Sequence, residues 1–260
     1  MRDDEVMVRK KARELLESIN SDRPPVDLST CASSIGAIIQ KSDNLPPQEC
    51  GQTIPCRGGQ SIIVVNASHL ESRQRFTIAH EIGHIMIKQA LANSERRLFE
   101  RDLNRFSNKP REEHLCDLFA AELLLPPELL KVSIRRQRQI SMSVIESLAA
   151  EFQASLTATG LRYAQMSDYD CAFIISEDLR LRYVAKSPSF PYWVHSLNSE
   201  LDSDTFAHDL FRGNPDDYRG IQDVDGSAWL EDGRIPEEIK EDSRFFPVYN
   251  QVISLIWNDD

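Results

Sequence analysis

The spacing of apolar residues predicts a mainly helical N-terminal part that contains a few strands. Apolar side chains recur near helical spacing over residues 4–19, 72–89 and 111–125, so we expect an amphipathic helix in each segment. Proline pairs follow the first and the last of these helices and prevent them from continuing. Two short runs rich in β-branched residues, 37–40 and Ser61–Asn66, predict strands between the helices.

Residues 141–166 predict two helices that break near Ala154, a pattern that looks like a helix-turn-helix. The second helix would present Thr157, Thr159 and Arg162 to a DNA groove. This is a thin set of base-reading donors, because recognition helices use Arg, Asn and Gln more heavily. Packing helices are therefore the favoured interpretation, and DNA reading is the alternative.

The C-terminal part of the chain differs from the rest in its predicted strands and its acidic charge, which predicts a second domain. Residues 171–185 predict a β-hairpin, and residues 248–257 predict a late strand. Residues 200–244 hold 14 Asp and Glu against 5 Lys and Arg, which accounts for −9 of the formal net charge of −11. Such an acidic surface repels a phosphate backbone. We therefore predict an α+β protein, with a mainly helical domain over 1–167 and a smaller acidic α+β domain over 168–260.

Composition and cysteine usage narrow the class of protein further. The content of 41% hydrophobic and 27% charged residues is that of an ordinary globular chain. The sequence shows neither the apolar stretch of a secretory signal nor an apolar run long enough for a membrane span. Its five cysteines form an odd set without repeating spacing. We therefore expect reduced thiols, a cytoplasmic location and no membrane partner.

Basic residues cluster in two stretches, 88–111 and 131–138, although the chain as a whole is acidic. A solvated face is the favoured interpretation of both clusters. A nucleic acid or an acidic partner on that side is the alternative. Residues 92–110 are charged and mixed, which predicts a surface excursion between two helices.

The residues with the clearest chemistry form an H-E-x-x-H pattern in a predicted helix. His80 and His84 lie one turn apart on one helix face, so their imidazoles can converge on one tetrahedral zinc ion. Glu81 lies one step around from His80 and can act as a general base on water without binding the metal. Gly83 in the middle of the helix predicts the close approach of a neighbour. A hydrogen-bonded structural histidine pair is the alternative.

The next helix offers a third metal ligand. Glu113 and Asp117 lie one turn apart, so one can bind zinc while the other accepts a hydrogen bond from the outer nitrogen of a ligand histidine. Glu112, His114 and Cys116 are rival ligands on the same helix. Glu112 and Cys116 share a face of their own and His114 points elsewhere, so only one set can meet the zinc.

Taken together, the two helices resemble those of the ImmA/IrrE family of metallopeptidases, which has a gluzincin-like site. The matching runs are Arg75–His84 and Glu113–Pro126, and Ile62–Asn66 is similar to the strand that precedes the metal helix in the family. The resemblance covers residues 5 to about 165. Cys116 departs from the family, which often has Ala at this position.

The resemblance implies a zincin-like peptidase domain with a small sheet. By that resemblance His80, His84 and Glu113 bind zinc, with manganese as the alternative metal. Glu81 is then the catalytic base, and Asp117 orients a ligand histidine. Some family members carry a GAF-like sensing domain after the peptidase domain, so a GAF-like fold is the expectation for the C-terminal part.

The resemblance also implies what such an enzyme acts on. Family members typically cut a helix-turn-helix repressor once and thereby derepress stress, mobile-element or anti-phage genes. We therefore expect a metalloendopeptidase whose substrate is a helix-turn-helix repressor, with DNA or a small molecule as a candidate activator. One alternative is a non-catalytic, zinc-stabilised regulator that binds DNA or a repressor. A second alternative is a general protease of loose specificity.

Two further expectations concern the segment before the metal helix. The strand Ser61–Asn66 is a candidate for β-augmentation, in which its unpaired edge would hold an extended substrate peptide. An edge that is simply covered is the alternative. Cys50 and Cys56 lie in a Pro/Gly-rich connection over residues 45–59 and are candidates for an inhibitory thiolate at the open zinc position. Ordinary loop cysteines are the alternative for this pair.

Overall fold

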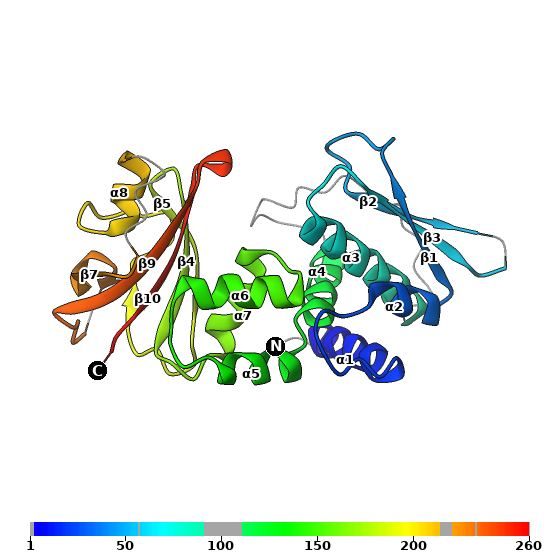
Figure 1. Ribbon diagram of the computed structural model, residues 1–260, viewed down its shortest axis with the longest axis horizontal. Coiled ribbons are helices and arrows are strands. Elements are labelled where there is room, and N and C mark those ends of the chain that lie inside the picture. The colour runs from blue at the N-terminus through cyan, green and yellow to red at the C-terminus, as the bar shows by residue number, and fades with distance from the viewer. Residues whose placement is uncertain (1–2, 57, 91–110, 214–219, 232, 260) are drawn as a thin grey trace. The chain divides into compact units, whose positions relative to one another are not determined.

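The structure is a computed structural model, and it describes residues 3–56, 58–90, 111–213, 220–231 and 233–259. Contacts within the chain define two compact units, Met1–Leu130 with Ala149–Ser155 and Lys131–Leu148 with Leu156–Asp260. Figure 1 shows the elements of both units, coloured in chain order. The surface excursion predicted for residues 92–110 and most of the first basic cluster lie outside the described residues.

The first unit combines helices with one three-stranded sheet, and its three long helices confirm the predicted ones. A shorter helix begins after Asp27, whose side chain accepts hydrogen bonds from the backbone N–H groups of Ser29 and Thr30. The helices are α1 (Asp3–Ser18), α2 (Leu28–Ser34), α3 (Glu71–Ala90) and α4 (Arg111–Leu124). The strands are β1 (Ala37–Ser42), β2 (Gly51–Pro55) and β3 (Ser61–Asn66).

The sheet of the first unit has the order β1-β3-β2. The central strand β3 runs parallel to β1, with Ile63 opposite Ile39, and antiparallel to β2, with Ile63 opposite Thr53. The predicted strands at 37–40 and Ser61–Asn66 are therefore confirmed. The expectation of an unpaired edge on β3 is wrong, because β3 is paired on both sides. The strand β2 lies in the segment that the sequence had indicated as a connection.

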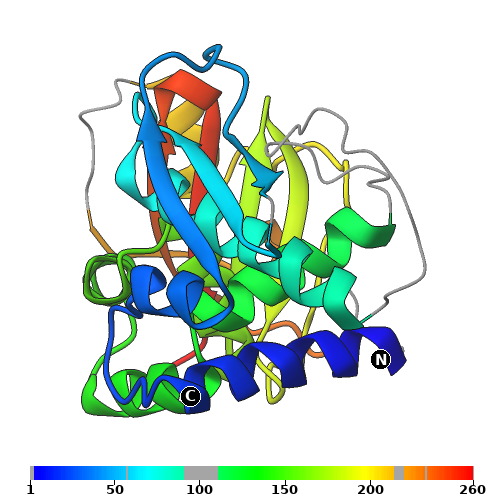
Figure 2. The same cartoon turned by 90° about the vertical axis from the view of Figure 1, so that its right-hand side faces the viewer.

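The helices α3 and α4 pack closely beside this sheet. A Cβ atom on Gly83 would lie 3.2 Å from the Phe119 ring and 3.4 Å from the Cα of Cys116, which confirms the predicted close approach. The helix α1 is tied to α4 through the fully buried carboxylate of Glu122, which accepts hydrogen bonds of 2.8 Å from Arg9 and Arg13. Figure 2 turns this unit toward the viewer, with α1 in dark blue along the lower edge.

Two more helices, α5 (Pro127–Arg136) and α6 (Met142–Phe152), contribute residues to both units. At the end of α5, Arg135 lies 3.5 Å from Asp168, and the two side chains are 61% and 69% exposed. This solvated pair agrees with the favoured interpretation of the second basic cluster. None of the helices in the described part of the chain combines the length and hydrophobicity needed to cross a bilayer.

The second unit is built on a five-stranded antiparallel sheet of order β5-β4-β10-β9-β7. The predicted hairpin and late strand are confirmed as β4, β5 and β10, and the α+β fold is confirmed with them. The domain boundary after residue 167 and the GAF-like assignment stay predictions. The main elements are β4 (Cys171–Glu177), β5 (Arg180–Lys186), β7 (Gln222–Asp225), β9 (Glu238–Phe246), β10 (Gln251–Trp257), α7 (Leu156–Met166) and α8 (Phe206–Arg212). Short elements complete it: β6 (Trp193–Val194), β8 (Leu230–Glu231), η1 (Gly226–Ala228) and η2 (Pro247–Tyr249).

The helix α7 packs against β4 and β5 of this sheet. A Cβ atom on Gly160 would lie 2.0 Å from the Phe173 ring, and Thr159 is fully buried. The two predicted helices are therefore present, but Thr159 faces the protein core. It is not available to a DNA groove, so the packing interpretation holds and the DNA-reading alternative is wrong on this point.

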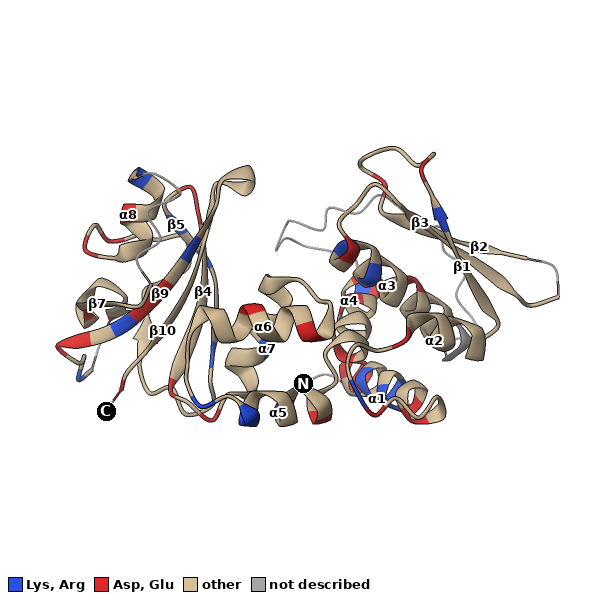
Figure 3. Ribbon diagram, viewed as in Figure 1, with Lys and Arg blue, Asp and Glu red and all other residues tan. Residues whose placement is uncertain are grey.

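Two neighbouring acidic residues of β9 hold the starts of two helices in the second unit. The buried carboxylate of Glu241 accepts hydrogen bonds from the backbone N–H groups of Phe206 and Ala207 at the start of α8. Asp242 accepts one from the N–H of Met142 at the start of α6. Side chains alternate between the two faces of a strand, so β9 can serve one helix on each side. Figure 3 shows acidic and basic residues interspersed along β9.

Candidate metal centre

The helix α3 places its two histidines and Glu81 in the core of the first unit. His80 and His84 are each 1% exposed, and Glu81 is fully buried. The Nε2 atoms of the two histidines lie 3.0 Å apart, so both rings present the same nitrogen to one point. Buried polar groups need partners to offset the loss of water, and the partners here come from α4 and β2.

Glu113 of α4 completes a compact group of three ligand residues. Its Oε2 lies 3.3 Å from His80 Nε2, and its Oε1 lies 3.3 Å from His84 Nε2. A tetrahedral zinc ion with bonds of ~2.0–2.1 Å separates its ligand atoms by about 3.3–3.4 Å. The observed separations of 3.0–3.3 Å therefore fit a zinc ion held by His80, His84 and Glu113.

The electrostatics of Glu113 agree with a ligand carboxylate. Burial opposes its ionisation, but the hydrogen bonds and charges of His80 and His84 outweigh burial and hold the pKa of Glu113 well below its usual range. The carboxylate is therefore anionic at neutral pH. A carboxylate oxygen beside two imidazoles is a donor set that binds zinc in hydrolytic enzymes.

Asp117 lies one turn after Glu113 and contacts the outer nitrogen of His80. Its Oδ1 is 2.8 Å from His80 Nδ1. A carboxylate oxygen can only accept, so Nδ1 carries the hydrogen and Nε2 keeps its lone pair toward the centre. The structure thus brings Asp117 to the position expected of a residue that orients a ligand histidine.

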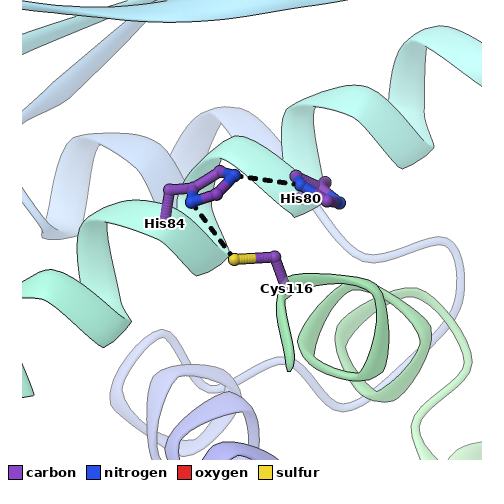
Figure 4. Close-up of side chains that lie close together, drawn as sticks. All are labelled: His80, His84 and Cys116. Carbon is purple, nitrogen blue, oxygen red and sulfur yellow. Dashed lines mark hydrogen bonds between the residues drawn. The ribbon is translucent and has the colours of Figure 1, made fainter. Parts of the chain in front are cut away.

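The outer nitrogen of His84 meets two of the three residues that the sequence indicated as rival ligands. Cys116 Sγ lies 3.3 Å from His84 Nδ1, and Glu112 Oε1 lies 3.4 Å from the same atom. Figure 4 shows the His84 ring between His80 and Cys116, with a different nitrogen directed at each. His80, His84 and Cys116 also form a cluster whose ligand atoms lie within 4.8 Å of one another and could hold a metal ion.

Thr53 of β2 is a site residue that the sequence did not indicate. Its hydroxyl donates a hydrogen bond of 2.7 Å to Glu81 Oε2. The close fit of β2 depends on Gly51, where a Cβ atom would lie 2.5 Å from Val64 O and 2.7 Å from Thr77 Cγ2. The only local signal for β2 is the short run Gln52-Thr53-Ile54, which is less than the length of a typical strand.

The remaining candidates of the sequence lie outside this group of ligand atoms. The buried Cys50 accepts a hydrogen bond of 3.3 Å from Arg73, and Cys56 Sγ lies 3.8 Å from Ile54 O. Neither belongs to the cluster of metal-ligating groups found among the described residues. Their role as inhibitory thiols stays a prediction. His114 Nε2 lies 3.9 Å from Glu5 of α1, so this imidazole points away from the centre, as its place on the helix predicts.

An H-E-x-x-H helix beside a second helix that supplies a glutamate defines the class of metallopeptidase-like domains. Residues 35–163, which contain both helices, match the model of the peptidase M78 family, described as the IrrE N-terminal-like domain. Residues 35–163 therefore form a domain of the ImmA/IrrE family, as the resemblance of the motifs implied. No curated protein matches the chain.

Solved structures show the same fold in another protein. One is a Mycobacterium tuberculosis transcriptional regulator, with a TM-score of 0.55 and 14% sequence identity. The alignment covers 96% of this chain and 75% of that chain. At this identity the likeness concerns the fold, and it extends over both units of the chain.

Proposed function

We propose that this protein is a zinc-dependent endopeptidase that makes one limited cut in a helix-turn-helix transcriptional repressor. The observation that carries the proposal is the convergence of His80 Nε2, His84 Nε2 and Glu113 at separations of 3.0–3.3 Å beside the buried carboxylate of Glu81. Membership in a peptidase family supports the same conclusion. The donor set favours zinc, and manganese is the alternative.

The residues of the centre divide the chemistry of peptide hydrolysis among them. His80, His84 and Glu113 would hold the metal, which when bound supplies Lewis-acid activation of water and of the scissile carbonyl. The carboxylate of Glu81 would accept a proton from the attacking water and deliver it to the leaving amine. Thr53 holds that carboxylate through the hydrogen bond to Oε2, which limits its rotation.

The strand proposed to bind the substrate is β2, in place of β3. Hydrogen bonds from Cys56 N to Gln60 O and from Asn66 N to Cys50 O fix which β2 residues bond to β3. In an antiparallel pair every second residue bonds to the neighbouring strand, so Cys50, Gln52, Ile54 and Cys56 direct their backbone groups toward β3. The backbone groups of Gly51 and Thr53 therefore point to the opposite edge of β2. No strand in the described chain pairs on that edge. An extended peptide bound there by β-augmentation would lie beside Glu81.

The nature of the substrate and its regulation rest on the family resemblance. A single cut inactivates a repressor without digesting it. Such a cut would release stress, mobile-element or anti-phage genes from repression. The solved protein of similar fold is a transcriptional regulator. We further propose a cytoplasmic location, and DNA or a small-molecule ligand of a GAF-like C-terminal domain as the activator.

The test is to mix the protein and its Glu81→Gln variant separately with the helix-turn-helix repressor encoded beside its gene. We expect intact-mass spectrometry to show a single cut made by the parent and not by the variant. Casein serves as a control that neither protein degrades. Tight DNA binding at physiological salt, with no cleavage of the repressor even when single-stranded DNA is added, would favour a non-catalytic regulator.

A further inference from the structure

We propose that Cys116 is a positioning residue that orients His84 as a metal ligand and does not itself bind the metal. The proposal rests on the proposed function, because it requires a metal ion at His80, His84 and Glu113. In this proposal Nε2 of His84 faces the metal site, and Nδ1 faces the Cys116 thiol.

The two nitrogens of His84 meet different chemistry. Nε2 lies 3.3 Å from Glu113 Oε1 and 3.0 Å from His80 Nε2, the separations expected of ligands on one zinc ion. Nδ1 lies 3.3 Å from Cys116 Sγ. When Nε2 gives its lone pair to a metal, Nδ1 carries the hydrogen, and sulfur can accept it as a weak acceptor.

Sulfur cannot join the same metal while the ring keeps this orientation. The two nitrogens of an imidazole direct their bonds away from each other, and Glu113 Oε1 lies at Nε2 of His84 whereas Cys116 Sγ lies at Nδ1. Figure 4 shows the thiol and His80 at different nitrogens of the His84 ring. A His80–His84–Cys116 site would need the ring to turn over, and His84 would then lose the contact between Nε2 and Glu113. The structure therefore assigns the thiol to orientation of the ring.

The outer nitrogen of His84 has a weaker carboxylate partner than the outer nitrogen of His80. His80 has the Asp117 carboxylate at 2.8 Å, whereas the carboxylate near His84 Nδ1, that of Glu112, is at 3.4 Å with its side chain 40% exposed. Water competes for an exposed carboxylate, which weakens its hold on the ring. Cys116 is fully buried and does not face that competition.

Gly83 lies where α3 and α4 approach each other closely, next to Cys116. A Cβ atom at position 83 would lie 3.4 Å from the Cα of Cys116, so the two helices approach each other at this point almost backbone to backbone. The glycine of the H-E-x-x-H segment and the cysteine of α4 thus act together.

The test compares the zinc dissociation constant of the full chain with those of Cys116→Ala and Cys116→Ser, by competition with a chromophoric chelator. We expect Cys116→Ala to bind zinc about 10–100-fold more weakly, the usual effect of losing a partner of a ligand histidine. Cys116→Ser should regain most of that loss, because its hydroxyl can still accept from Nδ1. Cys31→Ala, which also truncates a fully buried cysteine of the first unit, is the matched control and should bind zinc as the parent does.

The absorption spectrum of the cobalt-substituted parent separates orientation from ligation without any variant. We expect visible cobalt bands and no sulfur-to-cobalt charge-transfer band in the near ultraviolet. Such a band, or an unchanged zinc affinity in a folded Cys116→Ala protein, would overturn the proposal. A parent that binds no metal would overturn the proposed function as well, so the two failures are distinguishable.

Discussion

At the scale of single residues, the centre depends on contacts that the sequence could only partly predict. The spacing of His80 and His84 within one helix is enough to place both rings on one face. The contact of Cys116 with His84 Nδ1 joins residues 32 positions apart and depends on how α3 packs on α4. The contact between Thr53 and Glu81 depends on a strand that was not predicted. The ligand types and the position of Asp117 were therefore predictable, whereas the contacts of Cys116 and Thr53 were not.

The ligand assignment predicts a clear division between metal binding and turnover. His80→Ala and Glu113→Ala should each lose zinc, because each removes one of three ligand atoms. Glu81→Gln should keep zinc and lose at least about a hundredfold in turnover, because an amide cannot accept the proton. Metal content after gel filtration and repressor cleavage measure the two effects. His114→Ala is the control and should keep zinc, since His114 faces α1. Retained zinc in His80→Ala would refute the assignment.

At the scale of elements, pairing partners are harder to predict than the elements themselves. The periodicity of α1, α3 and α4 and the β-branched run of β3 were enough to predict those elements. Whether β3 is central or at an edge depends on β1 and β2, and β2 has only five residues between Cys50 and Cys56. The order of the sheet places β2, and not β3, at an edge where a peptide could be added.

The capping role of β9 predicts that Glu241 is a stability determinant of the second unit. Its carboxylate accepts hydrogen bonds from two backbone N–H groups of α8, the Trp229 indole and the Ser243 hydroxyl. Glu241→Ala leaves these buried donors without their acceptor and should lower the free energy of unfolding by about 3 kcal/mol. Glu238→Ala, at an exposed position of the same strand, is the control. Urea denaturation followed by circular dichroism measures both, and equal effects would contradict the capping role.

At the scale of the whole molecule, the sequence predicted a two-part α+β chain and located the chemistry in the first part. It did not predict α8, because this helix is only seven residues long. Short elements of this kind carry too little periodicity to be recognised. The extent of each unit also depends on α5 and α6, whose residues pack in both.

Buried thiols in the two units provide a way to observe their unfolding separately. Burial raises the pKa of Cys31, in the first unit, and of Cys171, in the second, to about 12. In the unfolded chain a cysteine thiol has a pKa of about 8.5. The raised pKa in the folded state therefore gives a stabilising contribution that is fully present below pH ~8.5 and is lost as the pH rises toward 12. At pH 8 both thiols are therefore protonated and protected while folded.

We expect iodoacetamide at pH 8 to label Cys31 and Cys171 only as urea unfolds their own units. The two labelling midpoints, read by peptide mass spectrometry, should differ because each unit has a hydrophobic core of its own. Cys56, which is partly exposed, is the control and should react in the native protein. Coincident midpoints would show that the chain unfolds as one cooperative body.

The ion pairs between α1 and Glu122 have a consequence for anyone who wishes to isolate the peptidase fold. The family match begins at residue 35, so a fragment designed on it would omit α1. Arg9 and Arg13 would go with it, although they balance a carboxylate that is fully buried on the helix of Glu113. Removing two counter-ions from a buried charge is destabilising. The first eighteen residues, outside the matched limits of the domain, thus help to keep the helix of Glu113 folded.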